Sequence, residues 1–73
     1  MRVKAEAIIN WIDLNLPPLA WRIIAMKQMK VLLKYKISPA NIDADTYFSA
    51  EIVEAIRVVV KVEYNKDLPN LYI

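Results

Sequence analysis

The chain contains neither cysteine nor histidine, so packing between side chains has to hold its 73 residues together. Domains near this length bury only about 60% of the surface that the unfolded chain exposes. They usually rely on a disulfide, a metal ion or a partner subunit in addition to their own core. Without cysteine and histidine, the partner subunit is the support that remains. Hydrophobic residues make up 58% of the chain, above the roughly 45–50% typical of soluble domains, which also favours a homo-oligomer.

The first amphipathic segment lies near the N-terminus. Its apolar residues recur at intervals of three and four, with polar residues between them: Ala7, Ile8, Trp11 and Ile12. This spacing predicts a helix over residues 3–14. The pair Pro17 and Pro18 ends it, because proline cannot continue the hydrogen-bond ladder and disfavours the helical region for the residue before it.

The second predicted helix, over residues 18–36, is apolar around most of its circumference. Proline suits the first turn of a helix, and Lys27, Lys30 and Lys34 form one narrow polar stripe. A helix that is apolar on so many sides is normally buried on several of them. We therefore expect it to supply much of the shared core of a homodimer. The predicted interface consists of Trp21, Ile24, Met29, Leu32 and Tyr35, with Leu68, Leu71 and Ile73 from the C-terminal tail.

The third predicted helix covers residues 47–64, after a loop rich in turn-forming residues. Its charged residues share one face: Glu51, Glu54, Arg57 and Lys61. The run from Val58 to Val62 is rich in β-branched residues that suit a strand, but the polar spacing favours a helix.

The chain has no glycine, so we expect its turns to use Asn, Asp and Pro. The predicted fold is all-α, a single domain over residues 1–73 with an apolar tail over 66–73 that docks.

Candidate catalytic and metal-binding residues are scarce. Nucleophilic and acid–base chemistry usually needs histidine, cysteine or paired carboxylates in a cleft, so we expect no enzyme activity. The loop from Asn41 resembles a calcium loop, but Thr46 stands where the turn requires glycine and Ile52 where the bidentate glutamate belongs. We expect no cofactor and no metal.

The distribution of charge leaves an alternative open. Basic residues predominate up to Lys36 and acidic residues after it. A basic stripe on one helix can follow a nucleic-acid backbone, and the candidate residues for this are Arg22, Lys27, Lys30 and Lys34. The net charge of only +2 and the apolar start of the second helix argue against it. A basic helix with tryptophan could also lie on an anionic membrane surface, although its apolar arc is wider than that requires.

The segment from Lys30 to Asn65, a helix, an acidic loop and then Ile52-Val53-Glu54-Ala55-Ile56, resembles the soluble C-terminal part of some small phage holins. That resemblance implies a small viral or mobile-element protein, and this chain lacks a counterpart of the spanning helix that holins carry.

The N-terminal residues do not have the pattern of a signal peptide, and charges interrupt every long apolar stretch. We expect a cytoplasmic protein without a membrane span.

The sequence therefore predicts a small non-enzymatic scaffold or adaptor that acts through protein–protein interaction as a homo-oligomer. Its partners would be a second copy and another protein. The alternative is a small nucleic-acid-binding protein that uses the basic stripe.

Overall fold

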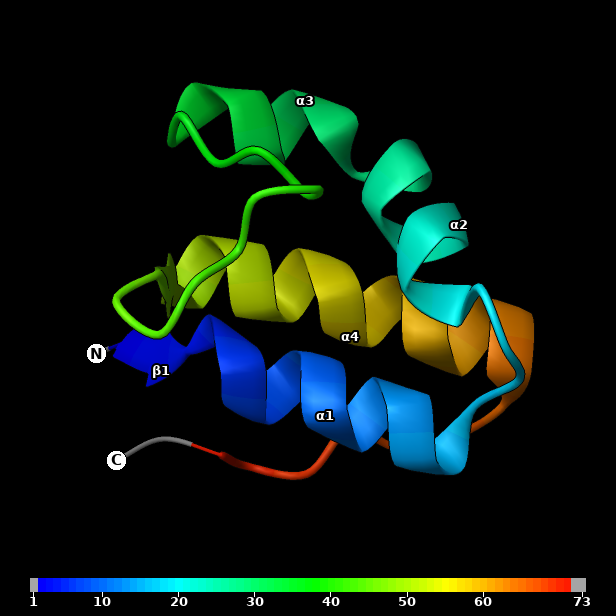
Figure 1. The fold of residues 1–73 in the computed structure, drawn as a ribbon. Coiled ribbons are helices and arrows are strands. Elements are labelled where there is room, and N and C mark those ends of the chain that lie inside the picture. The colour runs from blue at the N-terminus through cyan, green and yellow to red at the C-terminus, as the bar shows by residue number, and fades with distance from the viewer. Residues whose placement is uncertain (1, 72–73) are drawn as a thin grey trace.

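The computed structural model describes residues 2–71. Its elements follow in the order β1 (Arg2–Lys4), α1 (Ala5–Asn15), α2 (Ala20–Lys27), α3 (Met29–Lys34), β2 (Tyr47–Ser49) and α4 (Ala50–Tyr64). Figure 1 shows α4 in the middle, with α1 along one side and α2 and α3 along the other. The described chain is mostly helical, with one small antiparallel sheet.

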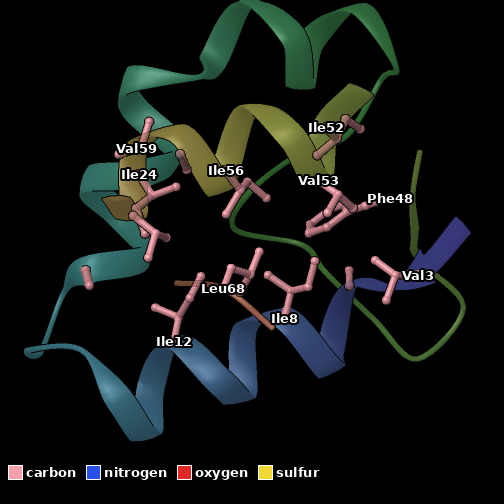
Figure 2. Packing of buried hydrophobic residues seen from close by; sticks show 14 of the residues in the cluster. Val3, Ile8, Ile12, Ile24, Phe48, Ile52, Val53, Ile56, Val59 and Leu68 are labelled. Atoms are coloured by element: carbon pink, nitrogen blue, oxygen red, sulfur yellow. The ribbon is translucent and has the colours of Figure 1, made fainter. Parts of the chain in front are cut away.

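The central helix, α4, presents a continuous buried stripe to the rest of the chain. The stripe consists of Ile52, Val53, Ile56, Val59 and Val60. Their spacing gathers them on one side of the helix, as expected for an amphipathic helix that faces a core. In Figure 2, Ile8 and Ile12 of α1 point toward this stripe from below, and Ile24 of α2 lies at its left end, beside Val59. All of these side chains belong to one cluster of buried residues.

The prediction that the valine-rich segment is helical is confirmed, because Val58 to Val62 lie within α4. The Ser49 side chain caps this helix and accepts a hydrogen bond from the Ile52 amide at 3.4 Å. Glu51 follows in the first turn, where a negative charge interacts favourably with the helix dipole.

Two predicted helix starts are wrong by three residues or fewer, for the same reason. Residues 3 and 4, like 47 to 49, are strands, because β1 pairs with β2 in antiparallel register. Val3 lies opposite Phe48, and both side chains are buried in the core. Cross-strand packing of these two side chains stabilises an extended backbone on both segments. The fold therefore includes a sheet that an all-α prediction leaves out.

The predicted helix over 18–36 is divided into α2 and α3 at Gln28, and it begins at Ala20. The Gln28 amide is shared between the carbonyls of Ile24 and Ala25, a bifurcated bond that is common at helix ends. No proline or glycine marks this break. The change of direction lets α2 contact both α1 and α4 while α3 also contacts α4.

Among residues 2–71, three have a left-handed backbone, namely Leu19, Lys36 and Asn65. Asn65 is one of the residue types that we expected at turns. Leu19 and Lys36 are not, and they stand at the two ends of the α2–α3 unit. At Lys36 the amides of Lys36 and Ile37 donate to the carbonyls of Leu33 and Leu32, the hydrogen-bond pattern of a Schellman motif. A lysine occupies the position that usually belongs to glycine.

The tail after α4 returns along the body of the protein. Leu68 is buried in the core cluster, and Leu71 packs against it. The Arg57 guanidinium donates a hydrogen bond to the Leu68 carbonyl, and Lys61 pairs with Asp67 at 3.2 Å. Ile73 lies outside the described residues. None of the helices within residues 2–71 is long and apolar enough to cross a membrane.

The central position of α4 is tested by a matched pair of valines. Val60 is fully buried, whereas Val62, two residues further on, is 73% exposed. We expect Val60→Ala to lower the free energy of unfolding by about 2 kcal/mol, because two buried methyl groups are lost and a cavity remains. Val62→Ala carries the same change in helix propensity and should stay within about 0.5 kcal/mol of the unchanged protein. Urea unfolding measures both, and equal effects would contradict the assignment of the buried face.

The left-handed backbone at Lys36 is tested by a second pair. We expect Lys36→Gly to raise the free energy of unfolding by up to about 1 kcal/mol, because glycine adopts positive φ without steric cost. The same substitution at Lys30, inside α3, should lower it by about 1 kcal/mol. If both variants were destabilised in urea unfolding, the Schellman ending of α3 would be wrong.

Candidate functional site

The outer face of α2 and α3 carries several large apolar side chains that the chain does not cover. They are Leu19, Ile23, Met26, Met29 and Leu33, all of which are exposed. Leu19, Ile23 and Met26 follow one another at intervals of four and three, so they form a stripe along α2 and its N-cap. Leu33 is exposed on α3, beyond the break at Gln28.

A groove runs beside this stripe, between the two helices and the segment over residues 37–40. It consists of two hollows that share Met29 and Pro39. The first has a volume of about 450 Å³ and is lined by Trp21, Arg22, Ala25, Met26, Met29, Pro39 and Ala40. The second, of about 380 Å³, is lined by Met29, Leu33, Lys36, Ile37, Ser38 and Pro39. We call the exposed stripe and this groove together the α2–α3 surface.

Trp21 fixes the far wall of the groove. Its indole N–H donates a hydrogen bond to the Pro39 carbonyl at 3.3 Å. Its ring stacks on buried Phe48, with 6.0 Å between the ring centroids. The loop after α3 is therefore held to α2 through a side chain that is itself anchored on the core.

A polar cluster fixes α3 to the start of α4. The Lys34 Nζ lies 3.0 Å from the Glu51 Oε1, and the Tyr35 hydroxyl donates to the same oxygen at 2.6 Å. The hydrogen bonds from Tyr35 and Lys34 lower the pKa of the Glu51 carboxyl. In turn, the hydrogen bond and negative charge of Glu51 raise the pKa of the Lys34 ammonium. These groups are exposed, so the cluster orients α3 more than it stabilises the fold.

The residues predicted for a homodimer interface lie in different parts of the structure: the core, the groove and the exposed surface. Ile24, Leu32 and Leu68 are buried within a single chain, so they are covered without a second copy. Trp21 and Met29 line the groove. Tyr35 is exposed and bonded to Glu51, while Leu71 is half-buried against the core.

Sequence reasoning missed four side chains of the surface: Leu19, Ile23, Met26 and Leu33. The signal that could have found them is their own helical spacing, since they avoid the face that includes Ile24 and Leu32. Periodicity separates the two faces of a helix but does not say which of two apolar faces is the inner one.

The basic residues of the nucleic-acid alternative are also divided. Lys27 lies 3.9 Å from Glu63, and Lys34 pairs with Glu51. Arg22 lines the first hollow and Lys36 the second. Within residues 2–71, Arg22, Lys30 and Lys36 make no ion pair. Two of these unpaired cations, Arg22 and Lys36, therefore lie in the groove itself, and Lys30 is exposed on α3.

No group of three or more Asp or Glu side chains that could hold a metal ion occurs in the described part of the chain. Comparison with protein-family models, with curated proteins and with solved structures found no match. The viral or mobile-element origin implied by the holin resemblance stays a hypothesis.

The polar cluster gives a pH-dependent contribution with a definite sign. Because the pKa of Glu51 is lowered in the folded chain, its contribution to stability is complete above the ordinary glutamate pKa and is lost as the pH falls through the lowered value. We expect Tyr35→Phe to move the pKa of Glu51 back toward its ordinary value, because this variant lacks the hydrogen bond that lowers that pKa most. Carboxyl carbon NMR titration measures this. Tyr64→Phe, on the same helix as Glu51, is the control, and an unchanged Glu51 pKa in Tyr35→Phe would refute the cluster.

Proposed function

We propose that this protein is a small non-enzymatic interaction module, an adaptor or scaffold, which binds another protein chain through the α2–α3 surface. The observation that carries this proposal is the gathering of uncovered apolar side chains on one helical face beside a groove. Folded proteins seldom leave neighbouring large apolar side chains exposed on one face, and such patches mark interaction sites.

The composition of the surface supports a protein ligand. Two methionines, Met26 and Met29, line the first hollow of the groove. Methionine has a flexible, polarizable side chain that adapts to different apolar partners, and it is frequent on protein-binding grooves. The groove is lined mainly by apolar side chains, with Arg22 and Lys36 as its only charged groups among the described residues.

A homodimer through the same surface is a second proposal. It is favoured by the exposed stripe, which a second copy could cover with its own. It differs from the homodimer predicted from the sequence, because Ile24 and Leu32 would take no part. Two folded monomers would meet at their surfaces rather than share one core.

Nucleic-acid binding has less support. Two of its four candidate residues, Lys27 and Lys34, are paired with Glu63 and Glu51. These carboxylates would stand beside an approaching phosphate and repel it. A phosphate backbone would also leave the leucines and methionines of the surface exposed to water.

The proposal is tested by two residues of equal exposure. Met26, in the surface, is 72% exposed, and Val62, on α4, is 73% exposed. We expect immobilised protein to retain specific proteins from a lysate of its host, and Met26→Asp to abolish that retention because the charge would be buried on binding. Val62→Asp should leave it intact, and nuclease treatment should have no effect.

Two results would contradict the proposal. Retention that survives Met26→Asp but not Val62→Asp would move the interaction to α4. Retention that disappears with nuclease and with alanine at Lys27, Lys30 and Lys34 would favour the nucleic-acid alternative. Circular dichroism of both aspartate variants checks that each one is folded.

A further inference from the structure

We propose that the partner of the α2–α3 surface is an amphipathic helix of another protein, whose apolar stripe is flanked by acidic side chains. This inference rests on the proposed function and specifies the chemistry of the ligand. It follows from the spacing of the exposed apolar residues, from the charges around them and from the backbone at Leu19.

The spacing fits a helical ligand. The exposed residues Leu19, Ile23 and Met26 follow one another at intervals of four and three, the repeat with which one helix packs along another. From Leu19 to Met26 a helix extends about 11 Å, so a partner helix of two to three turns along α2 would cover these three side chains. A helix that lays its apolar face into a groove is a common mode of peptide recognition, with anchors three, four and seven residues apart.

The charges select an acidic partner. Every charged residue from Pro17 to Lys36 is basic. Lys27 and Lys34 are neutralised by acids of α4, but Arg22, Lys30 and Lys36 are not paired within residues 2–71. Arg22 and Lys36 lie in the two hollows, so a helix along the groove passes a cation near each end.

A second copy of the chain fits this surface less well. Packing the surface against itself would bring Arg22, Lys30 and Lys36 of one chain toward the same cations of the other. Like charges that face each other across an interface are unfavourable and suppress the wrong partner. Acidic flanks on a foreign helix would turn the same positions into attraction.

The backbone at Leu19 points to the same surface. This residue is the N-cap of α2, has φ 69° and makes no side-chain capping bond. An N-cap favours Ser, Thr, Asp, Asn or Gly, and positive φ favours Gly or Asn. An exposed leucine here gains little inside its own chain and carries a local steric cost. Its side chain gains burial only when a partner covers it.

The test measures binding of three synthetic helical peptides to the whole protein. All three carry the same apolar stripe, flanked by glutamate in the first, glutamine in the second and lysine in the third. Trp21 lines the groove and reports binding through its fluorescence, in a Trp11→Phe background that removes the second tryptophan. At low salt we expect the glutamate peptide to bind about tenfold more tightly than the glutamine peptide, and the lysine peptide to bind most weakly.

Matched variants assign the effect to these residues. Arg22→Gln with Lys36→Gln should remove most of the preference for the glutamate peptide, because these two cations line the groove. Lys4→Gln with Lys66→Gln makes the same change in net charge at exposed positions elsewhere and should retain it. Leu19→Asn should weaken binding of every peptide while raising the melting temperature, because asparagine suits both the cap and the positive φ. If Leu19 served only to stabilise its own chain, Leu19→Asn would lower the melting temperature.

The outcomes separate this inference from the proposed function. Equal binding of all three peptides would overturn the acidic partner and leave protein binding standing. Binding of none, with self-association in sedimentation equilibrium that Met26→Asp abolishes, would identify a second copy as the occupant. Tighter binding to anionic phospholipid vesicles or to duplex oligonucleotide than to the glutamate peptide would overturn the inference in favour of those ligands.

Discussion

The packing of the buried stripe of α4 against α1, α2 and the strand pair holds this protein together. Ile56 stands at the middle of that stripe, with Ile8 of α1 below it, while Ile24 of α2 lies beside Val59 (Figure 2). No buried polar or charged residue interrupts the cluster within the described chain. Burial of apolar side chains is therefore the main favourable contribution to folding. The tail completes the cluster with Leu68.

The same packing explains why one apolar surface is left over. Helix α2 has apolar residues on both sides, and α4 covers only the side that contains Ile24. The opposite side, with Ile23 and Met26, remains in solvent together with the groove beside it. The high hydrophobic fraction of the sequence thus has two separate sources: the buried core of the chain, and the exposed apolar residues of the α2–α3 surface. Composition alone cannot distinguish them, because it counts both.

Much of the helical framework could be predicted from the sequence, and the reasons are local. The polar spacing of Glu51 and Glu54 identifies α4 in spite of its valines, and the proline pair ends α1 near the predicted residue. The strands could not be predicted, because three residues are too few to show a period and the two partners lie far apart in the chain. The break at Gln28 carries no proline or glycine, so only tertiary contacts indicate it.

The residues predicted for the interface are divided between the α2–α3 surface and the core. Trp21 and Met29 belong to the surface, whereas Ile24 and Leu32 belong to the core. Which face of an all-round apolar helix turns inward depends on where α4 lies, and that is not a property of the helix itself. The turns gave a further difference, because a chain without glycine was expected to use Asn, Asp and Pro in them, whereas positive φ is the conformation that favours Gly or Asn. Leu19 and Lys36 occupy two such positions instead.

The claim that the core closes within one chain, and leaves the α2–α3 surface for a different protein, is tested most directly by thermal unfolding of the purified protein over about a hundredfold range of concentration. A protein that folds as a monomer has a melting temperature independent of its concentration, whereas association of folded chains raises it. We expect a constant melting temperature, with the same helical circular dichroism signal at the lowest concentration. A melting temperature that rises steadily with concentration would contradict the claim that the surface is left for a different protein. Loss of the helical signal at the lowest concentration would return the protein to a homodimer in which folding and association are one equilibrium.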